Sequence, residues 1–298
     1  MASAELSVVV PAVNGGEALR ATLEALERQR QDVEIEVLVV NRLGVEAGRE
    51  LSREFGRVRL IDVAVDTSIP QMRALAFRAA TAPSVAVIED HVIVPSGWAR
   101  ALLGAQSAST PVVGGPVDNG ATGTIVDWAA FLCEYSACMP PLPAGASSWL
   151  PGNNIVYPRT LLDRYRAIVE AGGWENRLHD AMRADGIPLT CRPDIVVSHR
   201  MHYSLGLYLS QRFLYSRSYA ADRAQGAGFA RKILLLLSSL ALPPVLFVRT
   251  VSRVITKRRY LGALVWSLPL LVFFVVAWAA GEAMGTLAGA GNSLSKVR

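Results

Sequence analysis

The sequence predicts an α/β protein with a mostly parallel, doubly wound sheet that carries helices on both faces. Runs of β-branched residues alternate four times with segments of helical spacing before residue 90, as expected for parallel strands joined by crossover helices. The runs are continuously apolar, so we expect their strands to be buried on both faces. The expected strands are residues 7–13, 33–40, 58–65 and 84–88, and the expected helices are residues 18–30, 46–55 and 70–80.

The pattern is less regular from residue 110 onward. Gly- and Pro-rich stretches there surround an expected apolar helix at residues 125–138, and loops of this kind commonly cover a site on an α/β sheet. Further helices are expected within residues 160–186 and a late strand at residues 189–197. Ligands of such sheets bind beyond the carboxyl ends of the strands, which is where we look for functional residues.

The composition separates an acidic body from a basic, apolar tail. The 298 residues are 51% hydrophobic and 18% charged, which excludes a disordered or collagen-like chain. Residues 1–200 hold 18 basic and 23 acidic side chains, whereas residues 201–298 hold 12 and 2. The basic residues of the tail flank apolar runs, so the tail fits a membrane surface better than nucleic acid.

The tail is predicted to follow a globular domain at residues 1–203 and to contain an interfacial helix and membrane segments. Residues 204–232 interleave tyrosines with arginines, as in a helix at the headgroup level, although an ordinary surface helix is the alternative. Membrane segments are expected within residues 233–298. Of these, residues 261–281 carry no charge and measure about 31 Å as a helix, close to the thickness of a hydrocarbon core.

The first apolar segment of the tail, residues 233–248, is shorter and contains Pro243 and Pro244, which lack backbone donors and interrupt a helix. Five basic residues lie between positions 249 and 259. Two full spans with a cytosolic body would place them outside, against the positive-inside tendency. We therefore expect residues 233–248 to dip into the membrane and return, and residues 261–281 to cross it.

The body is expected in the cytosol. The opening MASAELSVVVPAVNGG lacks a basic region and a long apolar run, so we do not expect it to be a secretory signal. Cys133, Cys138 and Cys191 cannot all pair and lack CxxC spacing, which favours thiols in a reducing compartment.

Four segments taken in order carry a family resemblance. They are SVVVPAVNGGEALRATLEALERQ, EVLVVN, QMRALAFRAA and VAVIEDHVIVPSGW, and they begin at residues 7, 36, 71 and 85. In order and spacing they resemble a family 2 glycosyltransferase, over residues 5 to about 225. The resemblance implies a GT-A fold and an inverting transfer of a sugar from a nucleotide-sugar donor to an acceptor hydroxyl.

The resemblance implies a metal site at Glu89, Asp90 and His91. The family has a DxD motif ahead of a Pro-Gly-Trp turn, and counting back from Trp98 puts Glu89 and His91 on its two acidic positions. The metal, Mg²⁺ or Mn²⁺, neutralises the donor's diphosphate and helps it leave. With His91 as a ligand Mn²⁺ is favoured, because Mg²⁺ prefers oxygen; alternatively Asp90 takes the metal.

The donor side is expected along the strand ends. Asn41 stands where the family commonly has an Asp for the nucleotide base, and its amide can still donate and accept hydrogen bonds. Asp66 and Arg73 resemble the family's nucleotide-side acid and the Arg of its RN motif, and Arg73 is suited to pair with a phosphate. Pro11 and Asn14, at the end of the first strand, complete the expected donor site.

An inverting transfer needs a general base that takes the proton of the acceptor hydroxyl. By resemblance to the acidic motif of the family, Glu175 is the expected base and Asp180 the reserve candidate. A charge role at the start of a helix is the alternative for Glu175.

The acceptor side is expected around LPGNN. Its residues Gly152, Asn153 and Asn154 resemble the GN segment of the family. His179 lies four positions after Glu175, so on a helix the two share a face and His179 can orient the carboxylate or touch phosphate.

His199 and His202 have a spacing that can bind a metal. A pair without a third ligand is more often structural or interfacial, which is the interpretation we favour here. Gln211 and Arg212 only faintly resemble the QxxRW motif of processive family members, so polymer synthesis is not expected.

The sequence thus predicts a membrane-associated inverting glycosyltransferase of the bacterial cytoplasmic membrane, with its catalytic domain facing the cytosol. Its expected partners are a nucleotide sugar, the lipid bilayer and a lipid-linked or cell-envelope acceptor, but no nucleic acid. The alternative is a non-catalytic membrane protein on a degenerate glycosyltransferase body, because Asn41, Glu89 and His91 depart from the family pattern. Neither GxGxxG after the first strand nor GxxxxGK[ST] is present, which disfavours a dehydrogenase or nucleotidyltransferase.

Overall fold

The computed structural model describes residues 3–298, which form two compact units. The sheet unit comprises the chain up to Gly120 together with Cys138–Arg200. The helical unit comprises Ala121–Ala137 and Met201–Arg298. The tail therefore shares its unit with a short insertion from the middle of the sheet unit.

The sheet unit is built on an eight-stranded sheet with the order β3-β2-β1-β4-β9-β6-β10-β8. The first four strands in this order are parallel, and β9 is antiparallel to both β4 and β6. These strands are β1 (Leu6–Ala12), β2 (Ile35–Asn41), β3 (Val58–Asp62), β4 (Ser84–Val87), β6 (Val112–Gly114), β8 (Gly145–Ser147), β9 (Ile155–Pro158) and β10 (Leu189–Cys191). The predicted mostly parallel α/β architecture is confirmed.

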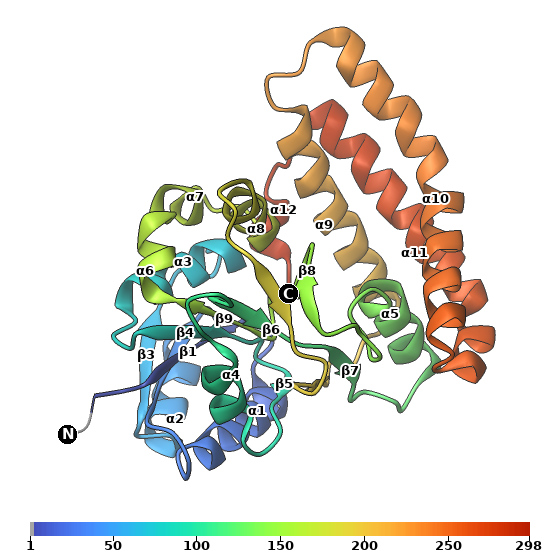
Figure 1. The fold of residues 1–298 in the computed structure, drawn as a ribbon. Helices are drawn as coiled ribbons and strands as arrows, with labels where there is room; N and C mark the ends of the chain where they lie inside the picture. Colours follow the sequence, from blue (N-terminus) through green and yellow to red (C-terminus); the bar gives the residue numbers. More distant parts are fainter. Residues whose placement is uncertain (1–2) are drawn as a thin grey trace. The chain divides into compact units, whose positions relative to one another are not determined.

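Helices cover both faces of this sheet. In Figure 1, α1, α2 and α4 lie on one face and α3, α6, α7 and α8 on the other. Their bounds are α1 (Gly16–Gln29), α2 (Val45–Glu54), α3 (Ile69–Ala79), α4 (Trp98–Ala105), α6 (Arg159–Arg164), α7 (Arg166–Glu170) and α8 (Glu175–Ala184). The start of α3 is fixed by a capping box between Ser68 and Gln71, which satisfies two backbone donors at the helix end.

The core of the sheet unit lies between these layers. Every residue of β1 is buried, as the continuously apolar sequence predicts. Val9 of β1 is in register with Leu38 of β2 and Val87 of β4, and all three side chains are buried. On the α3 side Met72 packs into the same cluster. The apolar strands therefore provide a rigid support for the polar residues at their ends.

The expected late strand at residues 189–197 is wrong as a single strand. It is divided into β10 and β11 (Val197–His199), which belong to different sheets. A turn separates them, in which Ile195 donates its backbone N–H to the carbonyl of Arg192 at 3.1 Å, and Pro193 suits the second position of such a turn. The second sheet has the order β5-β11-β7, with β5 at Val92–Ile93 and β7 at Val117–Asn119.

The helical unit contains α5, α9, α10, α11 and α12. Their bounds are Ile125–Tyr135, Leu205–Ala224, Phe229–Lys257, Leu261–Ala288 and Ser293–Lys296. Both α10 and α11 are long and apolar enough to cross a membrane. A tight turn joins them, in which Arg258 and Tyr260 have φ angles of 51° and 59°.

The expected interruption of the helix at Pro243 and Pro244 does not occur, because α10 continues through both residues. Two consecutive prolines deprive only the carbonyls of Ser239 and Leu240 of their usual donors. The helix extends over 29 residues around this point, so the local loss is tolerated.

Candidate active site

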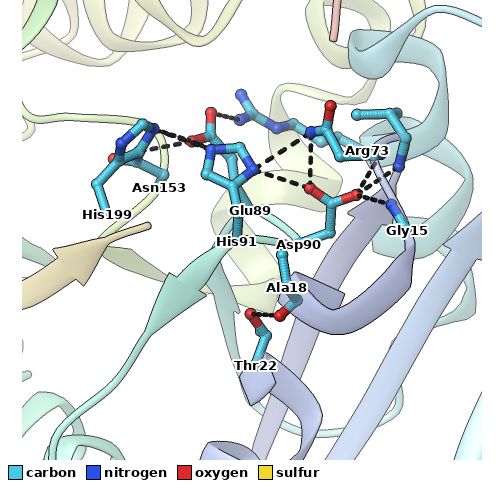
Figure 2. A network of polar contacts seen from close by, with 11 residues as sticks. Gly15, Ala18, Thr22, Arg73, Glu89, Asp90, His91, Asn153 and His199 are labelled. Atoms are coloured by element: carbon cyan, nitrogen blue, oxygen red, sulfur yellow. Dashed lines mark hydrogen bonds and ion pairs between the residues drawn. The ribbon is translucent and has the colours of Figure 1, made fainter. Parts of the chain in front are cut away.

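A polar cluster lies at the end of β4. Ile88 donates its backbone N–H to the carbonyl of Val9 at 3.1 Å, and Glu89, Asp90 and His91 follow directly. The pairing of β5 with β11 then brings His199 beside His91, although the two are 108 positions apart. Figure 2 shows the resulting network.

The carboxylate of Asp90 is fully buried and saturated with hydrogen bonds. Its Oδ2 accepts from the backbone N–H groups of Val13 (2.7 Å), Asn14 (2.6 Å) and Gly15 (3.3 Å). Its Oδ1 accepts from Asn14 Nδ2 (3.0 Å) and His91 Nδ1 (2.9 Å). Such a carboxylate has no lone pair left for a cation. The geometry therefore does not support Asp90 as the metal ligand, and instead gives it the task of fixing the loop after β1 and the His91 ring.

The other nitrogen of His91 faces two further ligand groups. Because an ionised carboxylate only accepts, Nδ1 of His91 carries the proton donated to Asp90, and Nε2 is the atom that presents a lone pair once the ring has lost its second proton. This Nε2 lies 2.9 Å from Nε2 of His199 and 3.4 Å from Oε2 of Glu89. The distance from Glu89 Oε2 to His199 Nε2 is 3.9 Å. Three ligand atoms thus converge from β11 and the end of β4.

The spacing of these atoms fits one divalent cation. An ion that holds its ligands at about 2.1 Å places neighbouring ligand atoms about 3.0 Å apart in an octahedron and about 3.4 Å apart in a tetrahedron. The observed separations of 2.9, 3.4 and 3.9 Å lie around these values. Two imidazoles and one carboxylate suit a transition metal such as Mn²⁺, and the bond from His91 to Asp90 fixes the ring for coordination.

The proximity of the three groups separates their pKa values. Burial lowers the pKa of His199, and the neighbouring His91 lowers it further, to about 3. Burial also opposes protonation of His91, but hydrogen bonds to Asp90 and Glu89 outweigh it and raise its pKa to about 10. Burial would raise the pKa of Glu89, yet the hydrogen bond and charge of His91 hold it well below its ordinary value. At neutral pH the metal-free cluster therefore holds His91 as an imidazolium, protonated on both nitrogens, beside a neutral His199 and an ionised Glu89.

Arg73 connects this cluster to Glu175. Arg73 lies in α3, with its side chain 8% exposed, and its Nη1 donates to Oε2 of Glu175 at 2.8 Å. Its Nη2 lies 4.0 Å from Oε1 of Glu89. Glu175 is the first residue of α8. The structure therefore brings the candidate metal ligands and Glu175 to one guanidinium group.

The segment before β9 supports both carboxylates. Asn153 donates its Nδ2 to Oε2 of Glu89 at 2.8 Å. Gly152 lies against Glu175, where an added Cβ would be 2.5 Å from the carboxyl carbon Cδ. Only glycine permits this close approach. A pocket beside these residues is lined by Arg73, Gly152, Tyr157, Trp174 and Glu175 among others.

Asn154, predicted on the acceptor side, has a structural task instead. Its side chain is fully buried. Its Oδ1 accepts from the indole N–H of Trp98 (3.0 Å), and its Nδ2 donates to the carbonyls of Pro116 (3.0 Å) and Ile195 (2.8 Å). These bonds use both amide hydrogens and join Asn154 to three separate segments of the sheet unit, which gives the side chain a structural task.

His179 is also placed differently from the prediction. It is 1% exposed, and its Nε2 lies 2.7 Å from the hydroxyl of Tyr157 on β9. Burial lowers the pKa of His179 and favours the neutral ring. The imidazole is thus part of the core between α8 and β9, and no hydrogen bond joins it to Glu175 within residues 3–298.

Three further predicted residues lie away from the cluster. Asp180 is on the outer side of α8, 74% exposed and 3.4 Å from Arg183. Asp66 is exposed in the loop after β3, and Pro11 is a buried residue of β1. In the described part of the chain no hydrogen bond or ion pair joins these side chains to the cluster, so the geometry does not support Asp180 as reserve base.

Asn41 closes its own loop at the end of β2. Its Nδ2 donates to the carbonyl of Gly44 (2.9 Å) and to Oδ1 of Asp62 (2.7 Å), and its Oδ1 accepts from the N–H of Leu43 (3.0 Å). The amide is buried and committed to these bonds. Asp62, at the exposed end of β3, presents the accessible carboxylate at this position.

Comparison with known proteins finds a family model that matches the first part of the chain. Residues 7–139 match the family model described as Glycosyl transferase family 2. The chain carries a family 2 glycosyltransferase domain. It is a glycosyltransferase that transfers a sugar from a nucleotide-sugar donor. No curated protein matches the chain.

Two solved structures are similar to the chain at low sequence identity. The mannosyltransferase PcManGT from Pyrobaculum calidifontis, in complex with GDP-Man and Mn²⁺, is 17% identical, with a TM-score of 0.55 over 94% of this chain and 87% of that one. Residues 1–349 of TarS from S. aureus are 14% identical, with a TM-score of 0.49 over 72% of this chain and 63% of that one. The likeness to PcManGT confirms the predicted GT-A fold.

His199 is the residue of the glycosyltransferase site that the sequence pattern misjudges. The pattern pairs it with His202, but His202 Nδ1 lies 3.0 Å from Oδ2 of Asp127 within the helical unit. His199 instead meets Glu89 and His91. Its position at the end of a late strand is a signal for a role as a metal ligand. Only the antiparallel pairing of β11 with β5 shows that it lies beside His91.

Proposed function

We propose that this glycosyltransferase is a membrane-associated, inverting enzyme in which Glu89, His91 and His199 hold a divalent cation and Glu175 is the general base. One observation carries the proposal. Arg73 lies 2.8 Å from the Glu175 carboxylate and 4.0 Å from Glu89, so the candidate cation ligands and the candidate base belong to a single polar network.

The donor's diphosphate is expected next to this network. When bound, the cation neutralises the diphosphate as it leaves. Arg73 adds a fixed positive group where negative charge builds in the transition state. Asp90 anchors the loop of Asn14 and Gly15 beside the cluster, so the loop keeps its position while the donor binds.

Glu175 is suited to take the proton of the acceptor hydroxyl. It is 21% exposed, so a substrate can reach its carboxylate. Arg73 and Gly152 fix the position of that carboxylate from two sides. A base held on the side opposite the leaving diphosphate directs the hydroxyl to the far face of the anomeric carbon and inverts its configuration.

Mn²⁺ and a nucleoside-diphosphate sugar are the ligands we expect. The complex of PcManGT with GDP-Man and Mn²⁺ supports this choice by its similar fold. The two imidazoles among the proposed ligands also favour Mn²⁺ over Mg²⁺. Asp62 is better placed than Asn41 to accept from the nucleotide base, because its carboxylate is exposed.

The acceptor is proposed to be lipid-linked or a glycan of the cell envelope, at the cytosolic face of the bacterial cytoplasmic membrane. Two long apolar helices, α10 and α11, support membrane association. The tail's 12 basic residues against 2 acidic ones favour the cytosolic side.

Replacement of Glu175 by Gln tests the proposed base. The substitution keeps size and hydrogen bonding but removes proton acceptance, so transfer should fall by about a thousandfold while donor binding stays within threefold. Asp180→Asn is the matched control, since it makes the same change on the outer side of the same helix, and it should keep full activity. Transfer is followed with radiolabelled donors and bacterial lipid extract, and donor binding by calorimetry with Mn²⁺. Retained turnover in Glu175→Gln would reject the assignment.

A further inference from the structure

The burial of α10 is reversed relative to a helix of a water-soluble protein. Leu234, Leu237, Val245 and Val248 lie on one side of the helix and are 55% to 66% exposed. They define what we call the apolar stripe. On the opposite side Ser239 and Thr250 are buried at 4% and 6% exposure. The large apolar side chains of the stripe thus face outward while the hydroxyls of Ser239 and Thr250 face inward, and such an exposed apolar surface is favourable next to an apolar medium.

Basic residues border the apolar stripe at both ends. Residues 229–260 contain seven Lys and Arg and no Asp or Glu. Arg231 and Lys232 precede the stripe, and Arg249, Arg253, Lys257, Arg258 and Arg259 follow it. An uncharged stripe between two basic ends is complementary to a lipid leaflet whose headgroups are anionic.

The turn between α10 and α11 is fastened to the insertion that contains α5. Lys257 donates its Nζ to the carbonyl of Ala137 at 3.0 Å. The ring of Tyr260 lies 4.8 Å from that of Trp128 in α5. Peptide bonds join this insertion at both ends to the glycosyltransferase domain, at Gly120 and Cys138. The 11 residues of α5 measure about 16 Å, too short to cross a hydrocarbon core of about 30 Å. The turn therefore stays on the domain's side of a membrane.

The C-terminal half of α11 is packed against the charged helix α9. Gly281 and Gly285 let the two helices approach closely, because an added Cβ would meet the carbonyls of Phe213 and Arg217. The guanidinium of Arg212 lies 4.1 Å from the ring centre of Trp278. A charged group thus accompanies α11 inside its uncharged run, and a charge at the centre of a bilayer is energetically costly.

The hairpin formed by α10 and α11 is therefore bound at its turn to the α5 insertion and at its other end to α9, and neither of these segments can cross a membrane. From these contacts we infer that α10 and α11 lie in the plane of an anionic lipid leaflet, with the apolar stripe in the hydrocarbon and neither helix crossing. This inference rests on the membrane association proposed above. It replaces the crossing that the uncharged run 261–281 predicts by its length alone, and it keeps residues 249–259 on the cytosolic side.

Labelling of introduced cysteines tests the topology in the full chain. Arg258→Cys probes the turn and Gln225→Cys the other end of the hairpin, since both positions are exposed. The parent chain is the blank, because its three native cysteines are buried or half-buried. With a membrane-impermeant maleimide, both variants should be labelled in inverted vesicles and neither in spheroplasts. Labelling of Arg258→Cys from outside the spheroplasts would overturn the inference.

Vesicle sedimentation tests the lipid contact itself. The wild-type chain should bind phosphatidylcholine vesicles more tightly when they contain phosphatidylglycerol. Leu237→Glu places a carboxylate in the apolar stripe and should weaken binding about tenfold or more. Ser210→Glu, an exposed position on α9, adds the same charge outside the stripe and should change binding less than threefold. Equal effects of the two variants, or self-association through the stripe without vesicle binding, would overturn the inference.

The two experiments separate this inference from the proposed chemistry. Donor binding is measured on the same variants and should be unchanged in both, which also shows that the variants are folded. Loss of vesicle binding with donor binding intact identifies the stripe as the membrane contact. A chain that transfers sugar but does not sediment with either kind of vesicle refutes the membrane contact and leaves the active-site assignment standing.

Discussion

Mn²⁺ binding should weaken about tenfold for each unit by which the pH is lowered. In the metal-free cluster His91 carries a second proton, on Nε2, because its pKa is raised to about 10, while His199, with a pKa of about 3, is neutral. Coordination of Nε2 requires that this proton leave. Below pH 10 the proton and the cation compete for the same nitrogen, so acidification favours the proton.

The magnitude follows from this single displaced proton. Glu89 does not titrate near neutral pH, because His91 and Arg73 hold its pKa well below the ordinary value despite burial. Between pH 8.0 and 6.5 the affinity for Mn²⁺ should therefore fall about 30-fold, or about 2 kcal/mol. The carboxylates of Glu89 and Asp90 and the imidazole of His199 do not add to this dependence of the Mn²⁺ affinity on pH.

Calorimetry in buffers of different ionisation enthalpy measures the proton release directly. We expect about one proton per bound Mn²⁺ at pH 7. His202→Asn is the matched control, because His202 pairs with Asp127 outside the cluster, and it should release the same number. Release of no proton, or of two, would refute the protonation pattern derived from the geometry.

Two substitutions test the packing around the site. Gly152→Ala puts a Cβ 2.5 Å from Cδ of Glu175, so the carboxylate must move and transfer should fall about a hundredfold with Mn²⁺ affinity unchanged; activity within threefold of wild type would contradict the positioning role. Asn154→Ala removes three buried hydrogen bonds and strands the indole N–H of Trp98, which should lower the free energy of unfolding by about 2 to 4 kcal/mol in urea titrations; a loss below about 1 kcal/mol would show that these bonds are not structural.

The strands and helices from β1 to β4 were predictable because their signals are local. The run that forms β1 is apolar at nearly every position, and its burial on both faces follows from that alone. The boundaries of α1 and α3 lie within two residues of expectation, since glycines, a capping serine and Pro70 mark them in the sequence. The late strand was wrong because a Pro-containing turn divides residues that share one apolar composition.

The site was only partly predictable because side-chain commitments are not visible in a sequence. Glu89, His91, Arg73 and Glu175 do converge, as their places at the ends of strands and helices imply. In contrast, the polar side-chain atoms of Asp90, Asn154 and Asn41 form hydrogen bonds to neighbouring loops and so stabilise the structure around the site. The identity of these residues gives no sign of that, since an amide that binds a loop and one that binds a ligand look alike in sequence.

In the tail, composition and tertiary contacts favour different arrangements of α11 in a membrane. The uncharged run 261–281 is long enough to span a membrane, and length was the basis for expecting a crossing. The contact of Tyr260 with Trp128, and those of Trp278 and Glu282 in α11 with Arg212 and Arg223 in α9, are tertiary. Only these contacts show that α11 is held by α5 at its start and by α9 further along.

Anomalous diffraction from crystals of the full chain grown with Mn²⁺ and a nucleoside diphosphate tests the central claim most directly. We predict one strong peak near the manganese absorption edge, at about 2.2 Å from Oε2 of Glu89, Nε2 of His91 and Nε2 of His199. The diphosphate should lie on the open side of that peak. A peak bound to Asp90, or no peak between the three side chains with the nucleotide in place, would contradict the account.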